Sequence, residues 1–305
     1  MWVQLPPSAQ IGVKALIEIC TYHNKKGGKA VTEIPGLKIS ISDKGHGTMS
    51  LTDYENTGFG INDSRFKRFF RQAKSFPSFY LTAIRNRLRF LQDCEIDFRK
   101  TFCPTLDLGD KIAVIDKHNQ FMFQESGVLF KSRFRFDSVI TDVPDLPLMF
   151  YAADCPIVIL FDRRKAFAKF HSGRENTLKN IAGKTARKME EKFFCRPADI
   201  VAYFPSPYIC EECHFLTFLG FNLEDREARR IKPAISEEKG GWKLDLRKAI
   251  EIQLRSEGVE QIIPNDPGCT LCNGGNHFSH RGWTLRHPHH TKSGRFAVVT
   301  VMRNV

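Results

Sequence analysis

The sequence predicts an α/β (α+β) fold in which mixed β-sheets are flanked by helices within a single compact domain. Segments with the two-residue period of strands and segments with the 3.6-residue period of helices are interspersed along the 305 residues, without strict alternation. That order favours a mixed sheet over a purely parallel one. Apolar residues make up 42% of the chain, which is ample for a core. We expect the domain to occupy residues 45–305 and residues 1–44 to form an N-terminal extension.

Each expected element follows from its local pattern of apolar residues. Apolar residues at i, i+3, i+4 and i+7 predict helices, and short alternating or apolar runs between turn residues predict strands. Helices are expected in the basic segment 64–92, from Thr177 onwards and over 246–256. Strands are expected over 37–42, 111–115, 120–123, 200–204 and 295–302, with a central hairpin over 151–173.

The central hairpin brings a cysteine and a histidine together. Two strand-like runs flank the basic turn 162–165, and Cys155 and His171 are equally distant from Arg163. If the turn folds symmetrically about Arg163, these two residues face each other with Cβ atoms roughly 4.5 to 5.5 Å apart. A thiol beside an imidazole can bind zinc or copper, or can act as nucleophile and base. An inert buried cysteine beside a satisfied histidine is the alternative.

The residues that follow His171 predict a place for an anion. Ser172 and Gly173 lead from the strand into the next helix, for which Asn176 or Thr177 is a plausible cap. Unpaired backbone N–H groups and the positive end of a helix dipole favour an anion such as phosphate.

Asp154, next to Cys155, has two interpretations. Its carboxylate could act as a general base or orient a ligand, because it adjoins the thiol. An aspartate at the end of a strand also serves as a cap or turn residue, and the sequence leaves both interpretations open.

The formal net charge of +12 raises the question of nucleic-acid binding. Between Ser64 and Gln92 there are eight Lys or Arg residues and no Asp or Glu, with phenylalanines interleaved. That composition is one footprint of RNA or single-stranded DNA binding. The helical spacing of the apolar residues favours instead two amphipathic helices with solvated basic faces, so nucleic acid is the less favoured partner.

Four of the nine cysteines form two Cys-x-x-Cys pairs, Cys210 with Cys213 and Cys269 with Cys272. This is the local spacing of a four-thiolate structural zinc site, although the pairs are further apart than in a zinc ribbon. An odd number of cysteines in a long chain argues against a disulfide framework. Since the sequence shows neither a run of about 18 apolar residues nor a signal-peptide pattern, we expect a cytoplasmic protein with no membrane partner.

Several motifs, in this order, resemble the polyphenol oxidase or laccase-domain family, whose members are described as zinc- or copper-binding purine nucleoside phosphorylases. The central match runs from Asp137 through Ala153-Asp-Cys155 to Phe170-His-Ser-Gly173. Shorter matches are Asn86-Arg-Leu-Arg-Phe-Leu91, Gly109-Asp-Lys111, Cys269-Thr-Leu-Cys272, Phe278-Ser-His-Arg281 and Gly294-Arg-Phe-Ala297. Together they cover roughly residues 45 to 305, and the resemblance implies one domain with mixed sheets flanked by helices.

The resemblance also implies an activity and a set of site residues. Phosphate would attack the anomeric carbon of adenosine, inosine or methylthioadenosine, and metal-assisted adenosine deamination is a second expected activity. Asp154, Cys155 and His171 are the candidate catalytic residues, and the last two are also the candidate metal ligands. The candidate residues for binding substrate and phosphate are Ser172, Gly173, His280 and Arg281. The planar guanidinium of Arg281 suits phosphate, although an exposed loop arginine is the alternative.

Some positions depart from the family pattern. Alignment on Gly109-Asp-Lys111 places Leu108 where the family has a histidine that is the first of three metal ligands. We therefore expect zinc or copper at Cys155 and His171 to bind weakly or not at all. The family's Trp after the His-Ala-Gly element is also missing. A catalytically impaired metal-binding homologue consequently remains an alternative to an enzyme.

Overall fold

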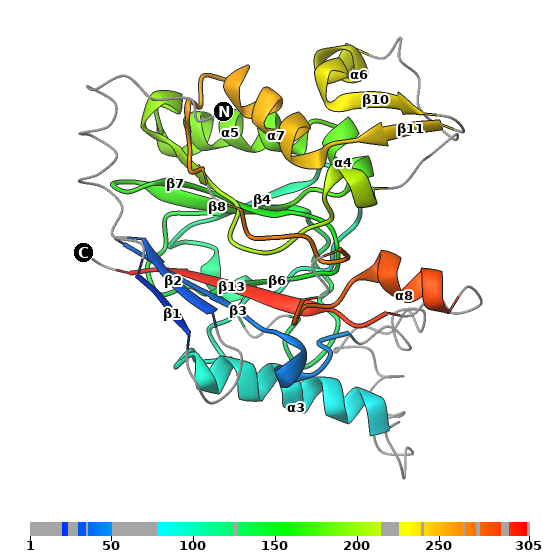
Figure 1. Ribbon diagram of the computed structural model, residues 1–305. Helices are drawn as coiled ribbons and strands as arrows, with labels where there is room; N and C mark the ends of the chain where they lie inside the picture. Colours follow the sequence, from blue (N-terminus) through cyan, green and yellow to red (C-terminus); the bar gives the residue numbers. More distant parts are fainter. Residues whose placement is uncertain are drawn as a thin grey trace.

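The computed structural model describes residues 20–23, 30–34, 36–50, 78–124, 127–214, 226–238, 241–264, 266–272, 275–287 and 293–303. Two β-sheets stack face to face, and helices cover the outer side of each (Figure 1). Helices α5 (Ile181–Phe193) and α7 (Leu246–Arg255) lie over one sheet, and α3 (Ser78–Asp93) lies under the other. This arrangement confirms the predicted α/β class with mixed sheets.

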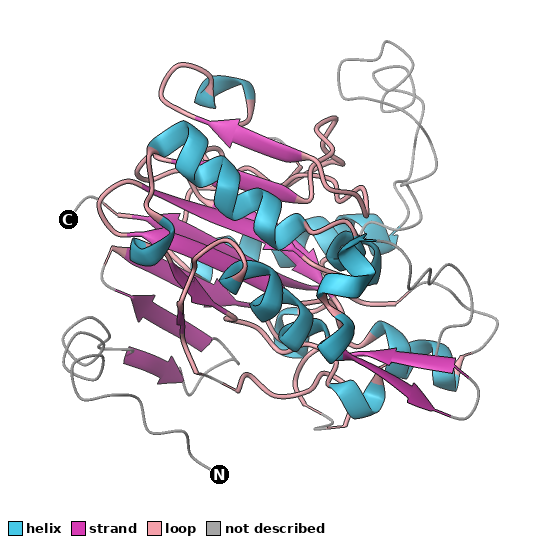
Figure 2. Ribbon diagram, turned by 90° about the horizontal axis from the view of Figure 1, so that it is seen from above, coloured by secondary structure: helices cyan, strands magenta, loops and turns pink. Residues whose placement is uncertain are grey.

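The sheet beneath α5 and α7 has six strands in the order β12-β9-β7-β8-β5-β4. Figure 2 shows both helices lying across these strands. The pairing is antiparallel at its centre and parallel at both edges, where β12 joins β9 and β4 joins β5. Its strands are β4 (Ile112–Ile115), β5 (Ser138–Thr141), β7 (Ile157–Asp162), β8 (Ala166–His171), β9 (Val201–Tyr203) and β12 (Gln261–Ile262).

The second sheet has five antiparallel strands in the order β1-β2-β3-β13-β6. They are β1 (Cys20–His23), β2 (Ala30–Ile34), β3 (Leu37–Ile41), β6 (Leu148–Ala152) and β13 (Phe296–Met302). Strand β3 lies in the segment that the sequence assigned to an extension, yet Leu37 and Ile39 are buried in the core between the sheets. The core of the domain therefore begins before residue 45.

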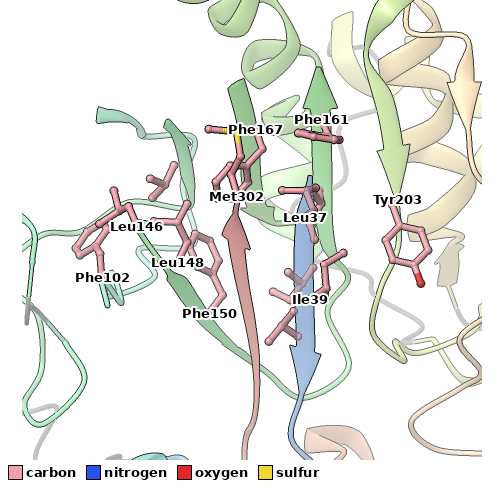
Figure 3. Close-up of a cluster of buried hydrophobic side chains, with 14 of the residues drawn as sticks. Leu37, Ile39, Phe102, Leu146, Leu148, Phe150, Phe161, Phe167, Tyr203 and Met302 are labelled. Atoms are coloured by element: carbon pink, nitrogen blue, oxygen red, sulfur yellow. The ribbon is translucent and has the colours of Figure 1, made fainter. Parts of the chain in front are cut away.

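Large apolar side chains from both sheets fill the space between them. Phe150 of β6 and Phe167 of β8 are fully buried there, and Leu148 belongs to the same cluster (Figure 3). One amine interrupts this apolar layer. The side chain of Lys169, also on β8, is fully buried and donates hydrogen bonds to carbonyls on β6 and β13.

The helix predicted from Thr177 is interrupted. Residues Arg174–Leu178 form α4, and a separate helix, α5, begins at Ile181. Asn180, between the two helices, adopts a left-handed conformation with φ 58°, and its side chain accepts a hydrogen bond from the N–H of Gly183 at 3.1 Å. Asparagine tolerates this conformation and is a good N-cap, so the break has a local cause that the continuous apolar spacing conceals.

The strand predicted over 120–123 is wrong. Residues Gln120–Met122 form a 3₁₀ turn, and Phe121 is 71% exposed. The carboxylate of Asp116 accepts hydrogen bonds from the N–H groups of His118 and Asn119, at 2.8 and 3.1 Å. A side chain that bonds its own backbone in this way offers the chain a turn in place of a sheet ladder.

Helix α3 confirms the second of the two basic helices, whereas the first lies outside the described residues. On α3, Phe90 and Leu91 are buried, whereas Ile84 and Leu88 are only half-buried. Arg87 is 3% exposed and donates hydrogen bonds to the carbonyls of Met49, Gly127 and Val128. At least one charge of the basic segment is therefore structural and does not face a ligand.

The remaining elements lie around one end of the sheets. Helix α6 (Arg226–Arg230) and the hairpin of β10 (Ile235–Glu238) and β11 (Gly241–Leu244) pack beside α7. Helix α8 (His280–Arg286) precedes β13. No helix in the described part of the chain is long and apolar enough to cross a membrane.

Candidate functional site

The thiol of Cys155 and the imidazole of His171 are neighbours, as predicted, but the predicted register is wrong by two residues. Strands β7 and β8 pair with Ile157 opposite His171, so the hairpin is symmetric about Arg164 and not about Arg163. Cys155 lies two residues before that pair, where the chain has left the strand. The thiol is half-buried and His171 is 4% exposed.

Gly173 provides the space for this contact. A Cβ atom at Gly173 would lie 2.9 Å from Cys155 Sγ and 3.4 Å from the Cε1 atom of His171. The first distance is shorter than a van der Waals contact between carbon and sulfur, so a side chain here would displace the thiol. Glycine at this position is thus required by the close approach of the cysteine.

Asp137 lies behind His171. Strands β5 and β8 are antiparallel, and the N–H of His171 donates to the carbonyl of Asp137 at 2.9 Å. The Nδ1 atom of His171 lies 3.7 Å from Asp137 Oδ1, an ion-pair distance. Burial alone would lower the pKa of His171, but the neighbouring Cys155 and Asp137 side chains outweigh it and raise the pKa to about 9. The imidazole is therefore protonated at neutral pH.

Asp137 also fixes the loop that contains Leu108. Its carboxylate accepts hydrogen bonds from the N–H groups of Asp107, Leu108 and Gly109, at 3.2, 3.1 and 2.9 Å. Burial would raise the pKa of Asp137, yet the nearby His171 imidazole and the hydrogen bonds from the loop lower it. The loop predicted to carry the family's first metal-binding residue is thus tied directly to the Cys155–His171 pair.

Leu108 does not supply a metal ligand, and its neighbour does not replace it. The Leu108 side chain is 54% exposed, on a backbone with φ 52°. The carboxylate of Asp107 is paired with Lys111 at 2.9 Å and with Arg135 at 2.7 Å. Neither residue therefore completes a ligand set with Cys155 and His171.

The backbone of the His-Ser-Gly turn is already hydrogen-bonded within the protein. The N–H of Ser172 donates to the carbonyl of Pro156 at 3.0 Å, and the N–H of Gly173 donates to Asn176 Oδ1 at 3.2 Å. The Ser172 hydroxyl bonds the hydroxyl of Thr177 at 2.8 Å. These groups shape the turn, and the anion contacts predicted for Ser172 and Gly173 would require them to exchange partners.

Asp154 connects the cysteine to two distant loops. Its φ of 92° is a conformation that non-glycine residues rarely adopt, and its side chain is 5% exposed. One carboxylate oxygen accepts from the hydroxyl of Thr270 and the other from the N–H of Arg281, both at 2.6 Å. Its carbonyl accepts from the N–H of Ile209 at 2.8 Å. These bonds favour the cap interpretation of Asp154 over the general-base interpretation.

Asp154 thereby places the start of α8 beside Cys155. Ser279 caps this helix by accepting from the N–H of Gly282 at 2.9 Å. His280 bonds the hydroxyl of Ser293 through Nδ1 at 2.9 Å, and burial, followed by the charge of Arg295, lowers the pKa of His280. Arg281, half-buried, is fixed through its backbone to the residue next to the candidate catalytic thiol.

The four clustered cysteines converge, as the two Cys-x-x-Cys pairs predicted. The sulfur atoms of Cys210, Cys213, Cys269 and Cys272 all lie within 4.8 Å of one another. Among the described residues, these four cysteines are the one group of three or more His, Cys, Asp or Glu side chains that lie close enough together to hold a metal ion. Burial would raise the pKa of Cys269, but N–H donors from Cys210, Cys272 and Leu271 lower it to about 7.

Sequence reasoning missed the roles of Asp137 and Asn176. Asn176 is fully buried and donates to the carbonyl of Gly109 at 2.6 Å while its Oδ1 accepts from Gly173. It joins the Leu108 loop to the His-Ser-Gly turn. A charged residue directly before a strand was the available signal for Asp137, but the pairing of β5 with β8 cannot be read from local sequence.

The protein is an α/β protein with two paired sheets and one candidate site. That site combines Cys155 and His171 of the central hairpin with Arg281 of α8. The chain belongs to the family described as multi-copper polyphenol oxidoreductase laccase, which it matches over residues 82–303. The family predicted from the motifs is thus confirmed.

A purine nucleoside phosphorylase of Clostridium acetobutylicum is 35% identical to this chain over 127 residues. The aligned part covers 41% of this chain and 52% of the relative, so the chain spans about half the length of the curated relative it matches.

Solved structures share the fold. YlmD from Geobacillus stearothermophilus superposes with a TM-score of 0.69 at 18% identity, covering 93% of this chain and 99% of that one. The hypothetical protein YfiH from Bacillus licheniformis superposes with a TM-score of 0.65 at 20% identity, covering 92% and 98%. At these identities the comparison supports the architecture alone.

The residues at Cys155 and His171 do not fit the metal centre that the family description implies. Catalytic zinc normally takes three protein ligands, and type 1 copper takes two histidines and a cysteine. Here one thiol and one imidazole are present, and neither Leu108 nor Asp107 adds a third ligand. Asp137 faces His171 but is already engaged by three backbone N–H groups.

Proposed function

We propose that the protein is a purine nucleoside phosphorylase that acts on adenosine, inosine or methylthioadenosine with phosphate at the Cys155–His171 site. The observation that carries this proposal is the placement of His171 between the Cys155 thiol and the Asp137 carboxylate, with Arg281 anchored to the adjacent Asp154. The family and the partial match to a named phosphorylase support the same reaction class.

The reaction needs a proton donor at the departing purine and a cationic group at the phosphate. The bond between the anomeric carbon and the purine nitrogen breaks as a phosphate oxygen bonds to that carbon. The departing purine requires a proton, which an imidazolium at His171 can donate, because its pKa of about 9 keeps it protonated at neutral pH. The hydrogen phosphate brings the proton that restores the imidazolium.

Phosphate requires a positive partner near the anomeric carbon. Arg281 offers a planar donor set that can hold two phosphate oxygens. His280 precedes it on the same helix turn, where its ring is held by Ser293. The bonds from Asp154 to Thr270 and to the backbone of Arg281 restrict how this turn moves, which preorganises the phosphate contact.

We propose phosphorolysis without a catalytic metal at this site. Adenosine deamination, the second activity that the resemblance implies, depends on a metal-activated hydroxide in zinc deaminases. Since Cys155 and His171 supply two donors, we expect deamination to be slower than phosphorolysis. Eight of the nine cysteines are free thiols in the structure, which suits a cytoplasmic location, and we also propose that location.

The leucine at position 108 favours a second candidate function, a catalytically impaired metal-binding homologue. An exposed apolar side chain stands where a metal ligand is expected, and the clustered cysteines provide a separate metal-binding geometry. Nucleic-acid binding is a weaker candidate, because Arg87 from the basic segment is buried in the core.

One assay separates these functions. Purified full-length protein is incubated with each of the three nucleosides, with and without phosphate, and free base is separated by chromatography. We expect base release that depends on phosphate and is reduced at least about a hundredfold by His171→Gln, a loss typical for a general acid. The control is Cys195→Ser, at a buried thiol of the core beneath α5.

The result that contradicts the proposal is the absence of phosphate-dependent base release from all three nucleosides by folded protein. In that case the impaired homologue becomes the better account. Salt-sensitive binding of RNA or DNA, together with absent phosphorolysis, would select the nucleic-acid function instead.

A further inference from the structure

We propose that Cys210, Cys213, Cys269 and Cys272 bind one zinc ion, which fixes two loops of the chain against each other. One loop surrounds the 3₁₀ turn Glu211–Cys213, and the other follows the bridge between Tyr208 and Cys269. The two cysteine pairs are far apart in the sequence, from Cys213 to Cys269, and the fold brings the pairs together. The site is distinct from the Cys155–His171 pair.

The sulfur separation matches a metal site and not a disulfide. Zinc–thiolate bonds are about 2.3 Å long, so two sulfur atoms of a tetrahedral site lie about 3.8 Å apart, the edge of that tetrahedron. Cys210 Sγ and Cys272 Sγ, one from each loop, are 3.8 Å apart. A disulfide would need about 2.05 Å. All four sulfur atoms lie within 4.8 Å of one another, so small shifts complete the tetrahedron.

Backbone N–H groups already point at one sulfur. Cys269 Sγ accepts from the N–H groups of Cys210, Leu271 and Cys272, at 3.4, 3.3 and 3.5 Å. Donors arranged in this way stabilise a thiolate, which is the form that binds metal. The two loops are also paired directly, because the N–H of Thr270 donates to the carbonyl of Tyr208 at 3.1 Å.

The chemistry of the four donors limits which metal ion can bind. Four thiolates in a tetrahedron suit zinc or iron, whereas copper(II) prefers nitrogen and oxygen ligands in a square arrangement. Apolar side chains surround the sulfur atoms on the inner side, including Ile231, Leu244 and Leu246. With four protein ligands, no position remains open for a substrate. The ion would therefore be structural.

The site has a consequence for the neighbouring residues. Ile209 precedes Cys210 and donates its N–H to the carbonyl of Asp154, and Thr270 follows Cys269 and donates its hydroxyl to the Asp154 carboxylate. An ion that holds both loops would thus hold two of the three hydrogen-bond partners of Asp154. Zinc would act as a positioning element for Asp154 and Arg281, without contacting the reactants.

Metal analysis of the purified full-length protein tests the proposal. We expect about one zinc ion per chain by mass spectrometry of the digested protein. Cys210→Ser combined with Cys272→Ser should reduce zinc content at least about tenfold, whereas Cys155→Ser should retain it. Cys195→Ser, which removes a buried thiol elsewhere, is the matched control. Zinc content requires no substrate, so it is independent of the phosphorolysis assay.

A measurement on the wild-type protein tests the proposal even if the variants do not fold. Titration with an organic mercurial should release one zinc ion per chain as the four clustered thiols are modified, with a fall in thermal stability, because binding free energy at a closed site is also folding free energy. Four results would each overturn the proposal. They are the absence of zinc, iron in place of zinc, a Cys210–Cys272 disulfide in protein purified under reducing conditions, and loss of zinc in Cys155→Ser.

Discussion

His171 combines burial, a thiol partner and a carboxylate partner in one side chain. The three side chains come from different parts of the sequence, since Cys155 precedes β7, Asp137 precedes β5 and His171 ends β8. The antiparallel pairing of β8 with both neighbours brings them together. At the residue scale, the site therefore depends on sheet register more than on any local motif.

Gly173 should be sensitive to the smallest enlargement. Gly173→Ala places a Cβ 2.9 Å from Cys155 Sγ, so the thiol must move, and displacing a reacting group by about 1 Å can cost roughly a hundredfold in rate. We expect a loss of at least about tenfold in kcat, with kcat measured at saturating phosphate. Gly109→Ala is the control, because its Cβ would meet nothing closer than 3.7 Å. Equal losses in the two variants would count against the close-approach argument.

Lys169 should give the protein a recognisable dependence on pH. Burial holds the pKa of this amine well below its usual value, while the unfolded chain has a pKa near 10.4. Between these two values the unfolded state binds the extra proton, so stability rises with pH, by at most about 1.4 kcal/mol per pH unit. The free energy of unfolding of the wild type, relative to Lys169→Met, should increase accordingly.

The measurement is urea denaturation of both proteins at several pH values between 6 and 9. The difference between them isolates Lys169 from other titrating groups. Lys232→Met, at an exposed position, should leave the slope unchanged. Parallel pH profiles for the wild type and Lys169→Met would contradict a lowered pKa at this position.

At the scale of elements, helix α8 has the clearest link to function. Its first turn is anchored by Ser279 and by Asp154, and Arg281 lies in that turn. A short helix held by a buried carboxylate can keep a guanidinium in place for phosphate without relying on its own length.

Arg281→Lys should weaken the use of phosphate more than the stability of the fold. Lysine retains the charge but loses the planar pair of donors, and a charge-assisted hydrogen bond contributes roughly 1.5 to 3 kcal/mol. We expect the KM for phosphate to rise, or kcat to fall, by about ten- to a hundredfold. Arg286→Lys, at an exposed position in the last turn of the same helix, is the matched control. Loss of activity only in proportion to folded protein would make Arg281 structural.

The Leu108 loop offers a test of the missing metal ligand. Histidine tolerates the left-handed backbone at this position, where φ is 52°. Leu108→His should therefore provide a third donor and raise zinc affinity at Cys155 and His171 by at least about tenfold, measured by chelator competition in the Cys210→Ser, Cys272→Ser background. Phe121→His, at a distant exposed position, should have no effect. Unchanged affinity would show that the loop does not bring position 108 to the pair.

At the scale of the whole molecule, local patterns predicted the mixed α/β class and the elements β3, β4, β9, α7 and β13. The predictions from apolar spacing failed where a polar side chain determines the local structure. Asn180 starts a new helix, Asp116 turns the chain where a strand was expected, and Arg87 occupies a buried position on α3. Convergence of the two Cys-x-x-Cys pairs followed from spacing, whereas the roles of Asp137 and Asn176 depend on non-local pairing.

The four-layer arrangement explains why the site lies where distant segments meet. Helices α5 and α7 fix one face of the six-stranded sheet, and the five-stranded sheet closes the other (Figure 1). The loops at one end of these strands are joined to Asp154 by hydrogen bonds from Ile209, Thr270 and Arg281. The fold thus brings to Asp154 groups that lie 55 to 127 residues away in the sequence.

The central claim is that phosphate, and not water, attacks the nucleoside at this site. Phosphorus NMR of a reaction mixture containing inosine and phosphate measures this directly. We predict a new resonance from ribose 1-phosphate that grows in step with free hypoxanthine, and that is strongly diminished with His171→Gln. Release of hypoxanthine without the phosphate ester would show hydrolysis, and an unchanged phosphate spectrum with folded wild-type protein would contradict the proposed phosphorolysis.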